Sequence, residues 1–183
     1  MKKTTSLALT CVFSLFASNS QAEISLYAGI ATGLSSFDYT DVEQGIATKA
    51  FAGYRLYDNI AFEATLYDSG NADINSLPGV SLSSTGINIA GLYRISTSVT
   101  NLTVMVGGGF YNFETTVVDP YYFLPFNTPA TEKGSGLSLA GGVELGVTKT
   151  IILRADIDMF FGVRDFANDG GINSLNLGIV LNF

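Results

Sequence analysis

Alternation between apolar residues and small or polar residues runs through most of the chain, and it is the feature that most restricts the possible folds. In the segment IILRADIDMFF (residues 151–161), every second residue from Ile151 onward is apolar or small, whereas Arg154, Asp156 and Asp158 lie on the other face. A period of two residues places these two sets on opposite sides of a β-strand. The pattern recurs in eight segments, namely 24–36, 48–56, 59–67, 86–96, 102–113, 135–147, 151–161 and 174–183. The sequence therefore predicts an all-β protein with eight strands.

The connections between these segments alternate between two lengths. Short connections lie near residues 57–59, 96–101 and 148–150, and long ones near residues 37–48, 68–84, 114–135 and 164–173. In an antiparallel meander, successive connections lie at opposite ends, so the short turns share one end and the long loops share the other. Outer-membrane barrels show this asymmetry between periplasmic turns and extracellular loops. The spacing predicts an eight-stranded antiparallel up-and-down transmembrane β-barrel with no linker inside it.

The composition favours a membrane environment over water. Hydrophobic residues make up 47% of the chain and charged residues only 14%, well below the roughly 25% charged residues of an average soluble domain. No segment reaches the ~18 consecutive apolar residues of a spanning helix, and a closed β-barrel is the other structure that spans a bilayer. A soluble lipocalin-like barrel is the rival interpretation. It fits less well, because the second face is rich in Gly, Ser, Asn and Ala, which suit a narrow lumen.

The first 22 residues have the pattern of a secretory signal peptide. A basic MKK start precedes the apolar segment LALTCVFSLFA, and Ser20-Gln21-Ala22 forms a small-x-small cleavage site. We therefore expect residues 1–22 to be removed and residues 23–183 to form the barrel domain. Cys11 is the only cysteine, so the mature chain needs no disulfide bond. Its 7 basic and 16 acidic residues give a net charge of −9, which argues against a nucleic-acid partner.

Eight charged residues are expected on the inward face, four of each sign. They are Lys49, Arg55, Arg94 and Arg154, with Glu63, Glu144, Asp156 and Asp158. An enclosed charge without a partner is costly, so a closed lumen requires opposite charges close together. Arg154 and Glu144 lie at similar distances from the turn at 148–150, and we expect them to form an ion pair. The network is interpreted as a plug that closes the lumen, with a gated ion path as the alternative.

The positions of the aromatic residues and the last residues of the chain also fit a transmembrane β-barrel. Interfacial girdles are expected from aromatic residues near the short turns (Tyr54, Tyr57, Tyr93) and near the long loops (Phe37, Tyr39, Phe110, Phe113). The final residues, NLGIVLNF, place Leu177, Ile179, Leu181 and Phe183 on the lipid side, and the last strand is expected to close the barrel against the first. The spacing of Asn176, Gly178, Leu181 and Phe183 resembles the C-terminal signal that barrel-assembly machinery recognises.

Three segments resemble the OmpA-like outer-membrane β-barrel family: FAGYRLYDNIAFEATLYDSG (residues 51–70), LYRI (92–95) and NLTVMVGGGFYNFE (101–114). The resemblance covers essentially all of the mature chain. It implies a barrel in the outer membrane of a Gram-negative-type bacterium with a structural, adhesion or defence role, and it maps the family's inward charges to Glu63, Glu144, Arg94 and Arg154. We expect no peptidoglycan-binding domain after the barrel, and the compact OmpX-like arrangement is the expected one.

The amino-acid composition limits the catalytic mechanisms that the chain could use. It contains no histidine, which excludes a Ser-His-acid triad, and no cofactor, metal or catalytic residues are predicted. Asp156 and Asp158 resemble an acid pair, but charge balance with Arg154 and its neighbours is the favoured interpretation. A lipid A-modifying enzyme and a narrow ion or small-solute channel are the alternatives to a structural or adhesion-type role.

The longest predicted loop holds an apolar patch, which consists of Tyr121, Tyr122, Phe123, Leu124 and Phe126. Exposed patches of this kind often mark binding sites. The patch is therefore a candidate contact surface for a host, phage or neighbouring envelope partner, or it folds over the barrel mouth and packs against itself. The expected partners are outer-membrane lipid, lipopolysaccharide and the assembly machinery, and the expected state is a monomer.

Overall fold

The computed structural model describes residues 25–38, 41–57, 59–77, 79–118, 130–165 and 168–183. These residues form nine strands and no helix: β1 (Ser25–Phe37), β2 (Gly45–Tyr57), β3 (Ile60–Asp68), β4 (Ala72–Asp73), β5 (Ser81–Ser96), β6 (Leu102–Val118), β7 (Ala130–Gly146), β8 (Ile151–Asp165) and β9 (Asn168–Asn182). Accordingly, the described part of the chain has no helix long and apolar enough to cross a membrane.

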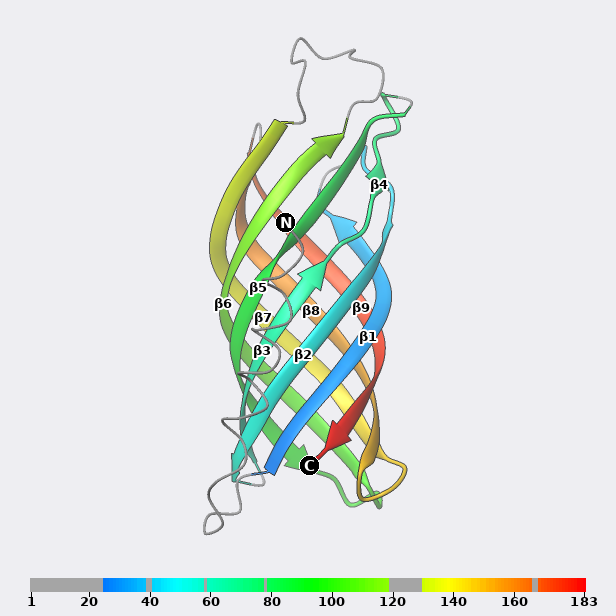
Figure 1. Cartoon of the computed structure of the whole chain (residues 1–183), viewed down its shortest axis with the longest axis vertical. Coiled ribbons are helices and arrows are strands. Elements are labelled where there is room, and N and C mark those ends of the chain that lie inside the picture. Colours follow the sequence, from blue (N-terminus) through cyan, green and yellow to red (C-terminus); the bar gives the residue numbers. More distant parts are fainter. Residues whose placement is uncertain (1–24, 39–40, 58, 78, 119–129, 166–167) are drawn as a thin grey trace, which may run out of the picture.

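The eight longer strands close into one antiparallel barrel (Figure 1). Each pairs with the strand before and after it, β3 pairs directly with β5, and β9 returns to pair with β1 from Tyr27↔Asn182 to Phe37↔Ile172. The two-residue strand β4 is an addition at the edge of β5. The predicted eight-stranded up-and-down barrel is thus confirmed, and the closing pair of first and last strands leaves the sheet without a free edge along this seam.

The short connections lie at one end of the barrel, together with the C-terminus (Figure 1). β2 and β3 are joined by residues 58–59, β5 and β6 by residues 97–101, and β7 and β8 by residues 147–150. Asn101 has a positive φ of 65° in the second of these turns, a conformation that asparagine tolerates better than most residues. We call this end the short-turn end and the opposite one the long-loop end.

The long connections are shorter than the sequence pattern predicts, because six strands continue into them. β2 begins at Gly45, β5 begins at Ser81, β6 extends to Val118, β7 begins at Ala130, β8 extends to Asp165, and β9 begins at Asn168. The predicted loop at 164–173 is therefore wrong for most of its length. Alternation identifies a strand only where one face is buried and the other meets lipid. Beyond that zone, backbone pairing continues between polar residues such as Thr116 and Thr131.

The outer surface is covered by large apolar side chains at alternate positions. Ile30, Ile46 and Leu177 are 67–68% exposed, and Phe110 is 73% exposed. A continuous exposed apolar surface of this extent marks contact with another apolar phase. On β5 the exposed large apolar side chains run from Ile87 to Ile95, about 26 Å along the strand at ~3.3 Å per residue. Because strands of outer-membrane barrels are tilted by ~35–45°, this covers about 20 Å of the ~25 Å height of their apolar band. The outer face of the barrel is therefore the lipid-facing one.

The aromatic girdles agree with the prediction at some positions and not at others. Tyr54, Phe62 and Tyr93 are exposed near the short-turn end, where Tyr54 stacks on Phe62 with ring centroids 5.5 Å apart. The prediction is wrong for Phe37 and Phe113, which point into the lumen and are buried, because their registers place them on the inward face of β1 and β6. Tyr39 and the side chain of Tyr57 lie outside the described residues.

Candidate functional site

The candidate site is the lumen, where the structure places all eight charged residues that the sequence assigned to the inward face. Seven of them are at least nine-tenths buried: Lys49, Arg55, Glu63, Glu144, Arg154, Asp156 and Asp158. The eighth, Arg94, has a side chain that is 11% exposed. The charges come from five different strands, so only barrel closure brings them together. They form three linked groups along the barrel axis.

The first group surrounds Lys49 near the middle of the lumen. The Lys49 Nζ atom lies 2.6 Å from Asp156 Oδ1 and 2.6 Å from Asp158 Oδ2. The Asn176 side-chain amide donates to the same two oxygens, at 3.0 and 3.1 Å. Asp156 and Asp158, which resemble an acid pair in the sequence, are thus both held by one ammonium group and one amide. Such partners offset the cost of enclosing the carboxylates.

The second group is centred on Arg154, on the side of the first group that faces the short turns. Its guanidinium binds both carboxylate oxygens of Glu63, and its Nε atom lies 2.7 Å from Asp156 Oδ2. The Tyr27 hydroxyl donates to Glu63 at 3.0 Å, and the Arg154 guanidinium lies over the Phe51 ring, 4.6 Å from its centroid. The bidentate contact fixes the orientation of both side chains, which a single lysine contact would not do.

The third group lies at the short-turn end of the lumen. Arg94 pairs with Glu144, and the Arg55 Nη2 atom lies 3.8 Å from the same carboxylate. Arg55 also donates to the Asn182 side-chain oxygen at 2.7 Å and lies over the Tyr27 ring, 4.8 Å from its centroid. Two guanidinium groups therefore face one carboxylate at this mouth of the barrel.

The expected ion pair between Glu144 and Arg154 is wrong. The two residues are direct cross-strand neighbours on β7 and β8, but the described ion pairs of Arg154 are to Glu63 and Asp156, and those of Glu144 are to Arg94 and Arg55. The long side chains reach across the narrow lumen to strands that sequence spacing does not place near them.

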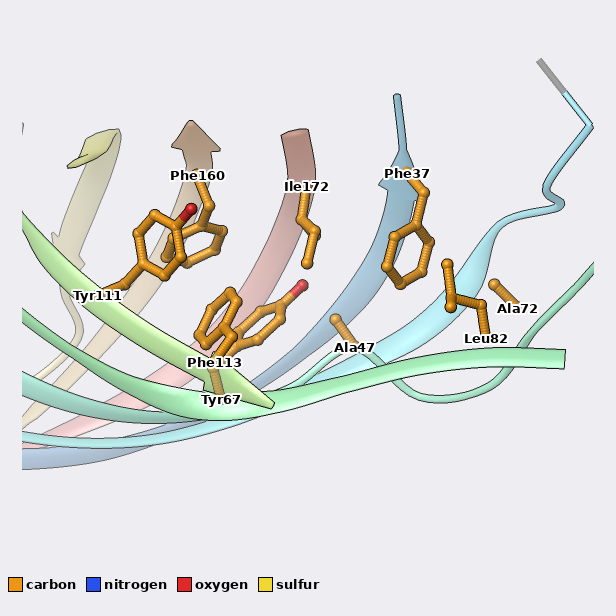
Figure 2. Close-up of a cluster of buried hydrophobic side chains, with 9 residues drawn as sticks. All are labelled: Phe37, Ala47, Tyr67, Ala72, Leu82, Tyr111, Phe113, Phe160 and Ile172. Carbon is orange, nitrogen blue, oxygen red and sulfur yellow. The ribbon is translucent and has the colours of Figure 1, made fainter. Parts of the chain in front are cut away.

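An aromatic layer fills the lumen on the long-loop side of the charges. Figure 2 shows Tyr67, Tyr111, Phe113 and Phe160 facing one another across it. The Phe113 ring centroid lies 4.8 Å from that of Phe160, 4.7 Å from that of Tyr111 and 5.5 Å from that of Tyr67. The Tyr111 hydroxyl donates to the Phe161 carbonyl at 2.8 Å, which satisfies its polar group at the wall. Further toward the long loops, the same cluster continues through Ile172, Phe37 and Leu82 (Figure 2).

Glycines on neighbouring strands make room for these large inward side chains. Tyr27 lies opposite Gly53, Phe51 opposite Gly29, and Phe113 opposite Gly86 in the strand registers. A Cβ atom added to any of these glycines would overlap the ring that faces it. The aromatic layer and Tyr27 are the parts of the site that the sequence analysis missed. The available signal was the matching of inward glycines to inward rings, which becomes visible only once the registers are known.

The four residues of the expected assembly signal divide between the two faces of β9. Asn176 is fully buried in the charge network, and Gly178 packs directly against Ala31. Leu181 and Phe183 face outward and are 42% and 69% exposed, with the Phe183 amide donating to the Leu26 carbonyl. Recognition of these residues by the assembly machinery stays a prediction. Two other expectations, the signal peptide and the loop patch at 121–126, lie outside the described residues.

The sequence matches the family described as "Outer membrane protein beta-barrel domain" over residues 5–183. The chain belongs to the outer membrane protein β-barrel family. Family membership confirms the resemblance drawn from the sequence and implies a location in the bacterial outer membrane. Among curated proteins, none matches the chain.

Solved structures of other members of this barrel class are similar in fold. Neisserial surface protein A is 17% identical, with a TM-score of 0.67, covering 87% of this chain and 97% of that protein. The N-terminal β-barrel domain of Pseudomonas aeruginosa OprF is 14% identical, with a TM-score of 0.57 and coverages of 86% and 97%. Ail, the attachment invasion locus protein of Yersinia pestis, is 10% identical, with a TM-score of 0.55 and coverages of 87% and 97%. At these identities, the likeness concerns the fold.

Proposed function

We propose that this outer-membrane barrel is a monomeric structural and surface-recognition protein whose lumen is closed to ions and solutes. The observation that carries the proposal is the continuous filling of the lumen. Ion-paired side chains occupy it from Arg55 and Glu144 to Asp158, and stacked rings occupy the part from Tyr67 to Phe37. An eight-stranded barrel is only just wide enough to hold its own side chains, so these two layers of described residues support a lumen without an aqueous path.

Planar-bilayer recording tests the closed lumen directly. We expect the purified, folded barrel to give no conductance steps above the bilayer background, under conditions in which a porin inserted into the same bilayer gives steps. Stable, ion-selective steps that scale with the amount of folded barrel would contradict the plug and favour the alternative, a narrow ion or small-solute channel.

The recognition part of the proposal is supported by the shape of the long-loop end. The last pair between β7 and β8 is Leu137↔Phe161, although β7 begins seven residues earlier, at Ala130, and β8 continues to Asp165. Among the described pairings, β7 pairs over this stretch with β6 alone, so the wall of the barrel is split between the described parts of β7 and β8. An unpaired strand edge offers backbone donors and acceptors to another chain. Ail is described as an attachment invasion protein, and we propose a contact role of this general class here.

Replacing residues 121–126 by a Gly-Ser segment of equal length tests this role. We expect reduced adhesion to host cells, or reduced phage adsorption, for cells that display the altered barrel. Lys149→Ser, in the short turn at the opposite end, is the matched control and should bind as the unaltered protein does. Unchanged binding after the loop replacement, with normal heat-modifiable migration of the barrel, would remove the loop patch from the proposal.

We also propose that the barrel has no catalytic role. The chain lacks histidine and, after removal of the signal peptide, cysteine, so the common nucleophile and base combinations are unavailable. Lipid A from an overexpressing strain should have the same mass spectrum as lipid A from the parent strain. A new lipid A species that depends on the folded barrel would show that it is an enzyme.

A further inference from the structure

A groove of about 800 Å³ crosses the outer, lipid-facing surface of the barrel. Ile30, Leu177 and Ile179 form one wall, Leu66 lies on the other side, and Ala50 lies between them. In the registers of β9, β1, β2 and β3, Ile179, Ile30, Ala50 and Leu66 occupy one row across the sheet. The Ile and Leu side chains on either side are 48–68% exposed, so the small side chain of Ala50 forms the bottom of the groove between them.

The groove changes from apolar to polar along its length. The next row toward the long loops contains Thr48, Asp68 and Thr85, which are direct cross-strand neighbours and line the same groove. All three are exposed on the outer surface, and Asp68 is the last residue of β3. The apolar part therefore lies within the hydrocarbon band. The polar part marks the long-loop edge of that band at Asp68, where β3 ends, whereas on β2 the exposed Ile46 extends the band further. The apolar part of the groove matches a lipid acyl chain, and the polar part matches the group that joins this chain to the headgroup.

Hydrogen-bonding chemistry distinguishes between the lipids that surround such a barrel. One Asp68 oxygen accepts from the Gly70 amide at 2.8 Å. A carboxylate accepts hydrogen bonds and donates none. It therefore favours a linkage that offers N–H or O–H donors. A phospholipid presents ester carbonyls at the start of its chains, which only accept. The amide-linked hydroxyacyl chains of lipid A present both an N–H and an O–H.

We propose that this groove binds one amide-linked hydroxyacyl chain of lipopolysaccharide. The chain lies over Ala50 between Leu66 and Ile30, and the amide or hydroxyl group at its start donates to Asp68. The long-loop end faces outward in barrels of this class, which places the polar end of the groove in the leaflet that holds lipopolysaccharide. The site is on the outside of the wall, so it is independent of the closed lumen and of loop recognition.

Native mass spectrometry of the folded barrel with added lipid A tests the proposal. We expect a one-to-one complex that survives collisional activation at which phosphatidylethanolamine is lost. Ala50→Phe fills the floor of the groove and should reduce the complex about tenfold. Asp68→Asn weakens the acceptor without changing its shape and should reduce retention of lipid A several-fold, to the level of phosphatidylethanolamine. A hydrogen bond to a charged group is worth about 1.5–3 kcal/mol and one to a neutral group about 0.5–1.5 kcal/mol, and a difference of 1.4 kcal/mol is tenfold.

Gly141→Phe is the matched control. Gly141 faces outward on β7, which contributes nothing to the groove, and an added Cβ would have only the Met105 carbonyl within 4 Å, at 3.9 Å. It should retain lipid A as the unaltered barrel does, and heat-modifiable migration verifies folding of all three variants. Equal complexes for the unaltered barrel and Ala50→Phe would overturn the site. Preferential retention of phosphatidylethanolamine, or no effect of Asp68→Asn, would overturn the assignment to lipopolysaccharide.

Discussion

The half of the lumen nearest the short turns is filled by charged side chains, whereas the half nearest the long loops is filled by aromatic rings. In the first, five residues of the Lys49 and Arg154 groups have side chains that are at most 8% exposed, and each has a partner of opposite charge. In the second, Tyr67, Phe113 and Phe160 make ring contacts with no ion pair among them. Both halves fill the same lumen. The stability of the first half depends on the pairing of opposite charges, and that of the second half depends on how well the rings fill the available volume.

The difference teaches which changes each half can accept. An ionic network holds only if all its members are present, because removal of one leaves another charge enclosed without its partner. A packed apolar layer loses stability in proportion to the volume removed and accepts residues of similar size. Substitutions of similar size should therefore be harmful in the ionic half and mild in the aromatic half.

The largest effect is expected for Arg154→Met. It removes the partner of Glu63 and Asp156 while keeping most of the side-chain volume, and should lower the free energy of unfolding by about 4 kcal/mol. Urea-induced unfolding in phospholipid vesicles measures this by far-ultraviolet circular dichroism, since the chain has no tryptophan. Adding Glu63→Gln to Arg154→Met should recover part of the loss. A loss below ~1 kcal/mol for Arg154→Met would show that charge matching does not stabilise this half.

Phe113→Ala should cost about 3 kcal/mol, because it leaves a cavity among the Tyr67, Tyr111 and Phe160 rings. Phe113→Leu keeps an apolar group of nearly the same size and should cost only about 1 kcal/mol. The same unfolding measurement applies to both. If Phe113→Leu proves as harmful as Arg154→Met, then the aromatic half is no more tolerant than the ionic half.

Gly86→Ala should cost about 2 kcal/mol through overpacking, because the added Cβ would overlap the Phe113 ring and the Asn112 carbonyl. Gly91→Ala is the control on the same strand. Gly91 faces outward, and the nearest atom to its added Cβ is in the Phe62 ring at 3.8 Å, so its effect should stay within ~0.5 kcal/mol. Equal effects at the two positions would mean that ring packing against glycine does not limit the lumen.

The smallest effect is expected outside the lumen, for Lys133→Ala. Lys133 and Glu114 are cross-strand neighbours whose charged atoms lie 3.7 Å apart, with side chains 76% and 51% exposed. A water-exposed pair of this kind contributes at most ~0.5 kcal/mol. The unfolding midpoint should hardly move, and the small loss should vanish at high salt. A loss comparable to that of Arg154→Met would show that exposure does not separate the two kinds of ion pair.

Much of the fold was predictable because membrane-spanning strands obey a simple rule. Outward residues such as Ile157 and Leu177 are apolar, inward residues such as Asp156 and Asn176 are small or polar, and this contrast reveals strand, face and order together. Past the apolar band, the outward residues become polar while inward residues such as Ile172 are apolar, so the expected contrast between the faces is lost. The strand extensions at residues 114–118 and 168–173 were therefore predicted as loops. Phe37 and Phe113 were misplaced for a related reason, since an aromatic residue suits either a girdle or a lumen.

The sequence predicted which charged residues belong to the candidate site, but it did not predict which of them form ion pairs. All eight inward charges follow from alternation along single strands, which is a local property of the backbone. Which charge meets which depends on strand tilt, on register and on how far a side chain reaches across the tube. Arg154 therefore binds Glu63, 91 positions away in sequence, rather than its cross-strand neighbour Glu144.

Amino-acid order alone was enough to specify eight strands, their two faces, the short-turn end and the sign of every enclosed charge. These properties follow from steric alternation and from the need to match apolar residues to lipid. Barrel closure decided the rest: the three ion groups, the seating of rings on glycines, the split rim between β7 and β8, and the outer groove over Ala50. Each of these joins residues from separate strands, and no local pattern encodes the distance between them.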